Sequence, residues 1–139
     1  MVSRVGPEEA HRVMGDPLDG FDGATGLYRA AGNARLYRKL IVIFSQRADE
    51  IVAEIDGSLV DDNLARARYL LHQLKGMAGN VSATNVYAAA VQLEEQVVAG
   101  AADPELLDVV RHHLEDVHAT ARRLMSKPPP ETGGDAPPP

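Results

Sequence analysis

The sequence predicts an all-α fold: an antiparallel up-down-up-down four-helix bundle with a short N-terminal lid helix. Three observations support this prediction. Apolar residues recur at intervals of three and four over four long stretches, and no alternating run is long enough for a strand. Each stretch is bounded by residues that cap or stop helices. The connections between the stretches are short, which favours antiparallel neighbours.

A short helix is predicted between Asp22, whose side chain suits an N-cap, and Gly32, a residue type common just past a helix end. We expect it to cover one end of the bundle. The first long helix is predicted to follow the N-cap candidate Asn33 and to stop at Gly57. Its apolar stripe is Tyr37, Ile41, Phe44, Ala48, Ile51 and Ile55.

The second long helix is predicted to begin after Asp61 and Asp62 and to break near Gly79 and Asn80. Its apolar residues keep the same spacing as those of the first helix. They are Leu64, Ala67, Leu71, Leu74 and Ala78.

The third helix is predicted from about Thr84 to Ala99, with Gly100 as its stop. The fourth has the clearest start, because Asp103 suits the N-cap and Pro104 suits the first helical position. The apolar stripes of these two helices are Val86, Ala90, Leu93 and Val97, then Leu107, Val110, Leu114, Val117, Ala121 and Leu124.

The two ends of the chain lack this periodicity. Residues 1–20 mix charge, glycine and proline, and are predicted to be a flexible N-terminal linker. Residues 127–139 hold six prolines and two glycines with almost nothing to bury, so a disordered tail is predicted there. The bundle is therefore expected over residues 21–126, as one domain.

Composition excludes several functions. The chain has no cysteine, which removes disulfides, thiolate metal sites and thiol nucleophiles and is typical of a reducing cytoplasm, where we expect the protein. The formal charge of −6 disfavours nucleic acid as a partner. The apolar runs are far shorter than the roughly 20 residues that span a bilayer, so no membrane partner is expected. We expect a monomer.

His72, on the second long helix, is the main candidate functional residue. On a wheel of about 100° per residue, the apolar side chains of this helix fall opposite His72, so the imidazole is predicted to face water. Arg68 and Lys75 flank it. Imidazole is a good nucleophile near pH 7, and its phosphorylated form carries a dianionic group whose charge these two cations can offset.

Gly76 and Gly79 share this outer face with Tyr69. A glycine inside a helix costs about 1 kcal/mol relative to alanine, and neither glycine serves the core. We therefore expect another molecule to approach the helix closely here.

The segment around His72 resembles the signature of histidine phosphotransfer domains, in which the histidine is followed after two residues by Lys-Gly and then by a small or polar residue. The segment is Leu71-His72-Gln73-Leu74-Lys75-Gly76-Met77-Ala78-Gly79-Asn80-Val81-Ser82-Ala83. Residues 26–33, with Leu36-Tyr37 and Phe44, are similar to the family's opening segment, and Asp62 stands ten residues before the histidine. The likeness covers about Phe21 to Met125.

The resemblance implies that His72 is the phosphorylated nucleophile, that Lys75 compensates the phosphoryl charge, and that Gly76 leaves room for a receiver domain. Two positions depart from the pattern: Gln73 stands where Ser or Thr is more common, and Ser82 where Gly is frequent. The residues expected to bind the partner are Arg68, Tyr69, Gln73, Gly76, Gly79 and Asn80.

By the same resemblance, the protein is expected to be a phosphorelay intermediate. It would accept a phosphoryl group from a receiver-domain aspartyl phosphate and transfer it to, or back from, another response-regulator receiver aspartate. Its expected partners are receiver domains and a sensor or hybrid histidine kinase. No Gly-rich loop of the phosphate-cradling kind is present, so no ATP site and no cofactor of its own are expected. A Mg²⁺ ion is expected on the partner receiver, which completes the transfer chemistry.

A metal-binding bundle is one alternative, because Glu115-x-x-His118 on the fourth helix is similar to half of a carboxylate-bridged metal site. The helical wheel argues against this alternative. Glu115 lies outside the apolar stripe, His113 and His118 fall on opposite flanks, and the four predicted long helices contain no second Glu-x-x-His. No metal site is expected.

A non-catalytic receiver-docking bundle is the second alternative, because a shared fold does not guarantee activity. It would bind receivers without phosphoryl transfer. The presence of both His72 and Lys75 counts against it.

Overall fold

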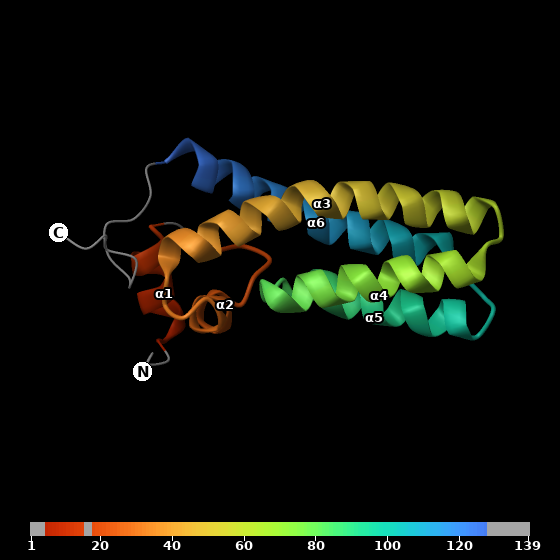
Figure 1. Cartoon of the computed structure of the whole chain (residues 1–139), viewed down its shortest axis with the longest axis horizontal. Coiled ribbons are helices and arrows are strands. Elements are labelled where there is room, and N and C mark those ends of the chain that lie inside the picture. The colour runs from red at the N-terminus through yellow and green to blue at the C-terminus, as the bar shows by residue number, and fades with distance from the viewer. Residues whose placement is uncertain (1–4, 16–17, 128–139) are drawn as a thin grey trace.

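The computed structural model describes residues 5–15 and 18–127, and these residues contain helices and turns but no strand. Two short helices, α1 (Pro7–Met14) and α2 (Gly23–Arg29), precede four long ones. The long helices are α3 (Ala34–Val60), α4 (Leu64–Asn80), α5 (Thr84–Val98) and α6 (Pro104–Ser126). They run antiparallel in chain order, which confirms the predicted all-α bundle (Figure 1).

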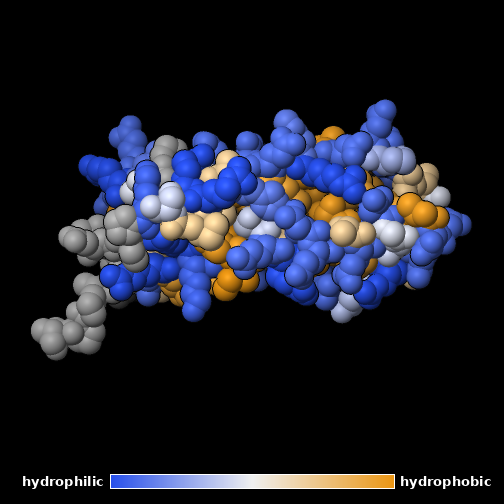
Figure 2. Space-filling view, turned by 90° about the horizontal axis from the view of Figure 1, so that it is seen from above, coloured by the Kyte–Doolittle hydropathy of each residue, from blue (hydrophilic) through white to orange (hydrophobic). Residues whose placement is uncertain are grey.

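The core follows the predicted apolar stripes. Every stripe residue of the four long helices except Leu64 is buried, and Leu64 packs against the core from its edge. The largest side chains with almost no exposure are Tyr37, Ile41, Ile51, Ile55, Leu70, Leu71, Leu74, Leu93 and Leu107. The face seen from above Figure 1 is mostly hydrophilic, with apolar residues showing in gaps between polar side chains (Figure 2). No helix in the described ranges has the length and apolar character needed to span a membrane.

Gly57 does not end α3, so the predicted stop was wrong. The helix continues to Val60 because Ile55 and Ser58, on either side of the glycine, are buried against the bundle. The helix ends one turn later, where Asp62 adopts a left-handed φ of 55° and the amide of Asn63 donates to the Ser58 carbonyl at 2.8 Å. Packing of one turn thus outweighs the unfavourable helix propensity of a single exposed glycine.

The other long-helix boundaries lie close to their predicted positions. The side chain of Asn63 caps α4, one residue after the predicted Asp61-Asp62 start, and α4 ends at Asn80 as expected. Asp103 caps α6 with Pro104 in its first turn, as predicted. α5 begins at Thr84, ends at Val98 and is followed by Gly100 with a φ of 79°.

The prediction that residues 1–20 form a linker was wrong over the range of α1. This helix has Pro7 in its first turn and is followed by its C-cap residue Gly15, which has a φ of 78°. Ala10 and Met14, one turn apart, are buried, and so is Leu18. The apolar residues are too few for a visible period, but the rest of the fold supplies the surface that covers them. Residues 1–4, 16–17 and 128–139, which include nearly all of the predicted tail, lie outside the described ranges.

α2 covers the end of the bundle, as expected for the lid helix, and it is held by two specific contacts. The Asp22 amide donates to the Ser82 carbonyl at 2.8 Å, joining the start of α2 to the α4–α5 turn. Inside this junction the Tyr37 hydroxyl donates to the Val81 carbonyl at 2.8 Å. Gly26 packs directly on the Tyr37 ring, where a Cβ atom would lie 2.1 Å from ring carbon Cζ. The absence of a side chain at residue 26 therefore makes room for this tyrosine.

Candidate functional site

His72 lies in the middle of α4 on the solvent side of the helix. Its side chain is 77% exposed, while its neighbours Leu71 and Leu74 are fully buried. The helical phase predicted from the sequence is therefore confirmed. The tertiary structure places the imidazole where a second protein can reach it.

A carboxylate from the next helix lies beside the imidazole. Glu94 of α5 has its Oε2 atom 3.9 Å from His72 Nδ1, and only 18% of its side chain is exposed. Its other oxygen, Oε1, accepts a hydrogen bond of 2.9 Å from Lys75 Nζ. The lysine therefore holds the carboxylate next to the ring.

This hydrogen bond also acts on the lysine itself. It raises the pKa of Lys75 above its ordinary value, with partial burial opposing the shift and the charge of Glu94 adding to it. Lys75 thus remains a cation over the whole physiological range, and in the resting protein its charge is balanced by Glu94. The sequence predicted Lys75 as a neighbour of His72 but did not predict this partner.

The two flanks of α4 can be assigned from contacts. Arg66, Gln73 and Asn80 recur every seven residues, and Arg66 lies 3.8 Å from Glu54 of α3, so this flank faces α3. Lys75, which contacts α5, marks the opposite flank. His72 lies between the two flanks, on the ridge that faces away from the core.

The predicted glycines leave the backbone near His72 open on one side. A Cβ atom added at Gly76 would have no neighbour within 4 Å, so the space above this residue is free. At Gly79 the ring of Tyr87 from α5 lies 3.7 Å from the corresponding position. Tyr87 is 42% exposed and was not predicted as a site residue.

The remaining predicted partner-binding residues lie on the same helix as His72. Tyr69 is 55% exposed; its hydroxyl accepts a 3.0 Å hydrogen bond from Gln73 Nε2, and the Arg66 guanidinium lies 5.7 Å from its ring centre. Arg68 and Asn80 are exposed on the same helix. These side chains lie along α4 from one turn before His72 to about two turns after it, outside the core.

The histidines of α6 do not converge. His118 contacts α3: its Nδ1 lies 2.5 Å from Ser45 Oγ and its Nε2 lies 2.8 Å from Asp49 Oδ1. Glu115 Oε2 lies 3.7 Å from Nδ1 of His112, and the His112 side chain is 75% exposed. Within the described ranges, no three His, Asp or Glu side chains are close enough together to hold a metal ion.

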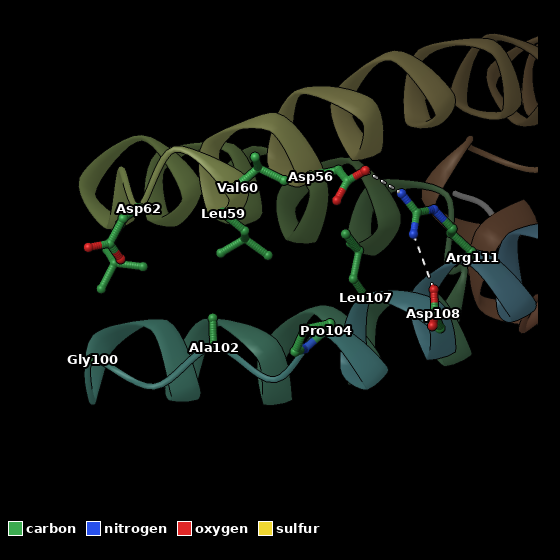
Figure 3. Close-up of a pocket in the computed structure, with 11 residues that line it drawn as sticks. Asp56, Leu59, Val60, Asp62, Gly100, Ala102, Pro104, Leu107, Asp108 and Arg111 are labelled. Carbon is green, nitrogen blue, oxygen red and sulfur yellow. Dashed lines mark hydrogen bonds and ion pairs between the residues drawn. The ribbon is translucent and has the colours of Figure 1, made fainter.

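A pocket of about 370 Å³ lies elsewhere, between the α3–α4 turn and the start of α6 (Figure 3). Arg111 crosses one side of it and pairs with Asp56 and Asp108, each at 3.2 Å. Its lining is mainly apolar and contains no histidine. This pocket is therefore separate from the site around His72.

Glu94 and Tyr87 are the two site residues that sequence reasoning missed. Both come from α5, whose register against α4 depends on the tertiary packing. The sequence contained a signal for Glu94, because this residue directly follows Leu93 of the apolar stripe and is one of only two charged residues in α5. A charged residue at the edge of an apolar stripe often pairs with a neighbouring helix.

A comparison with known protein families matches the region that contains His72. A family model described as "Hpt domain" matches residues 39–120, which is more than half of the chain and includes α4, α5 and most of α3 and α6. The comparisons found no matching curated protein and no matching solved structure.

Proposed function

The chain belongs to the Hpt domain family, whose members carry out histidine phosphotransfer in two-component phosphorelays, and on this premise we propose that His72 is the residue that carries the phosphoryl group. The protein accepts the group from the aspartyl phosphate of one receiver domain and passes it to, or back from, the aspartate of another. The observation that carries the proposal is the exposed imidazole with its Nδ1 beside the carboxylate of Glu94.

The geometry favours Nε2 as the nucleophilic atom. A carboxylate near Nδ1 favours the tautomer with the proton on Nδ1, which leaves the Nε2 lone pair directed away from Glu94. In the transfer step this lone pair forms the N–P bond while the bond between phosphorus and the aspartyl oxygen breaks. The aspartate leaves as a carboxylate. No proton needs to move, because the ring keeps its Nδ1 proton and becomes positively charged.

Glu94 and Lys75 have complementary roles in this step. The carboxylate stabilises the positive charge that develops on the ring, as a buried acid does for a catalytic imidazole. The ammonium group stabilises the negative charge on the phosphoryl oxygens. Because Lys75 is hydrogen-bonded to Glu94 before transfer, we propose that it shares its donors between the carboxylate and the arriving phosphoryl group.

The partner supplies what this chain lacks. We propose that the receiver domain brings the phosphorylated aspartate and its Mg²⁺ ion, and that the protein is a phosphoryl carrier with no ATP site. The open space above Gly76 allows the receiver backbone to approach α4, while Tyr69, Gln73, Gly79, Arg68 and Asn80 form the contact rim.

The test is phosphoryl transfer from ³²P-labelled, phosphorylated receivers of the same organism to the full chain. We expect at least one receiver to label the wild-type protein and no label on His72→Gln. His112→Gln is a matched control, because His112 is nearly as exposed, at 75%, but lies on α6. Label on His72→Gln, or its loss only in His112→Gln, would show that the proposed nucleophile is wrong. Receiver binding without any transfer would instead support a docking bundle.

A further inference from the structure

Charge along α3 is strongly segregated. Between residues 34 and 48 this helix has four basic residues and no acidic one, whereas residues 49–60 have four acidic residues and no basic one. The basic part includes the N-terminal turns of α3, where cations are unfavourable because the helix dipole is positive at that end. Helix stability therefore does not explain the arrangement, and the net charge of −6 makes a basic region unusual for this chain.

The same part of α3 extends beyond the helix it pairs with. α3 has 27 residues and its antiparallel neighbour α4 has 17, so the first ten residues of α3 pass the end of α4 (Figure 1). Two large apolar side chains remain open there: Leu36 is 41% exposed and Ile43 is 45% exposed. Lys39 lies between them and is exposed. We call Leu36, Lys39 and Ile43 the overhang surface.

The overhang surface lies on the His72 side of the molecule. Leu36 and Ile43 precede Glu54 by 18 and 11 residues, which is close to five and three helical turns, so all three share one flank of α3. Glu54 contacts Arg66 of α4, so this flank faces the α4 side. The opposite flank carries Ser45, which contacts α6.

The overhang surface is close enough to His72 for one partner protein to contact both. Ile43 is level with the end of α4, eight residues beyond His72, or about 12 Å along the helix axis. A standard interface covers about 800 Å² on each protein, which corresponds to a disc of about 16 Å radius. A receiver that reaches His72 can therefore cover Ile43 and Lys39 at the same time.

We propose that the overhang surface is a specificity-determining contact for the receiver, binding an apolar patch bordered by carboxylates. This rests on the proposed phosphotransfer at His72. Leu36 and Ile43 supply the apolar contact, and the exposed Lys39 selects for negative charge on the partner.

The test measures receiver affinity separately from chemistry. The dissociation constant of the best-transferring receiver is measured by calorimetry at 50 and 500 mM salt, for His72→Gln protein carrying Lys39→Glu or Ile43→Ser. We expect Lys39→Glu to weaken binding about tenfold at low salt and much less at high salt, because steering between opposite charges is screened. Ile43→Ser should weaken binding at both salt concentrations, and Lys39→Arg should restore wild-type affinity.

Arg122→Glu is the matched control, because Arg122 is an exposed cation on α6, away from the α3–α4 face. An equal loss of affinity in Arg122→Glu and Lys39→Glu would overturn the inference, since the effect would then come from net charge alone. Unchanged affinity in both overhang variants, with transfer to His72 intact, would also overturn it while leaving the proposed function standing. Absence of transfer from every receiver would refute the proposed function instead.

Discussion

Replacing Glu94 with glutamine tests whether this carboxylate assists the imidazole. The change keeps the size of the side chain and an acceptor oxygen for Lys75, but it removes the negative charge 3.9 Å from His72 Nδ1. In the proposed step the ring becomes positive as the N–P bond forms. Loss of the carboxylate should therefore slow transfer onto His72 more than it affects receiver binding.

The expected size of this effect follows from the distance and the exposure. Two unit charges 3.9 Å apart interact by about 1 kcal/mol in a water-like dielectric and by about 4 kcal/mol at the effective dielectric near a protein surface. Because the His72 side chain is 77% exposed, the lower value applies. A loss of about 1 kcal/mol corresponds to roughly a fivefold lower rate constant.

The assay is rapid-quench transfer from a phosphorylated receiver at saturating concentration, so that the rate constant reports the chemical step. Glu95→Gln is the control, because it makes the same substitution at the adjacent, exposed position of α5. We expect a rate reduced about fivefold for Glu94→Gln and unchanged for Glu95→Gln. An unchanged or faster rate in Glu94→Gln, or equal effects in both variants, would refute the role assigned to Glu94.

Three further predictions concern the scaffold, each measured by urea unfolding. Tyr37→Phe should cost about 1–3 kcal/mol, because the Val81 carbonyl loses its buried donor. Burial raises the pKa of Tyr37, so the wild-type advantage should be complete below pH 10 and shrink above it by up to about 1.4 kcal/mol per pH unit; a constant difference would contradict this. Gly57→Ala should stabilise the protein by about 0.5–1 kcal/mol, since Gly57 is an exposed helical residue with free space around it, and destabilisation would refute that assignment. Gly26→Ala should destabilise by about 1–3 kcal/mol, because its Cβ would overlap the Tyr37 ring, and a neutral effect would show that the junction can adjust.

The long helices and the outward position of His72 could be predicted from the sequence because both depend on local spacing. An apolar stripe with a period near 3.6 determines which side of a helix must be covered, and His72 falls opposite that stripe on α4. The caps Asn33 and Asp103 likewise act on amides of their own helices. Interactions between residues that are close together in the sequence can therefore be predicted from the sequence alone.

The bounds of helices with weak sequence signals could not be predicted in the same way. The continuation of α3 through Gly57 and the existence of α1 depend on surfaces supplied by distant parts of the chain. Burial of Ser58 and Met14 stabilises turns that propensity and local pattern alone do not favour. Tertiary packing contributes more to helix stability than propensity does, so these boundaries could not be read from neighbouring residues.

The sequence by itself therefore determined the bundle, the exposed His72 and its cation Lys75 one turn away. Only the tertiary structure decided that Glu94, 22 positions further along the chain, lies beside the ring and binds that cation. It also decided that the first turns of α3 extend past the end of α4 on the His72 side. The physical reason is that helical periodicity defines the faces of each helix. How neighbouring helices align along their axes, and where one extends past another, is decided only when those faces pack together.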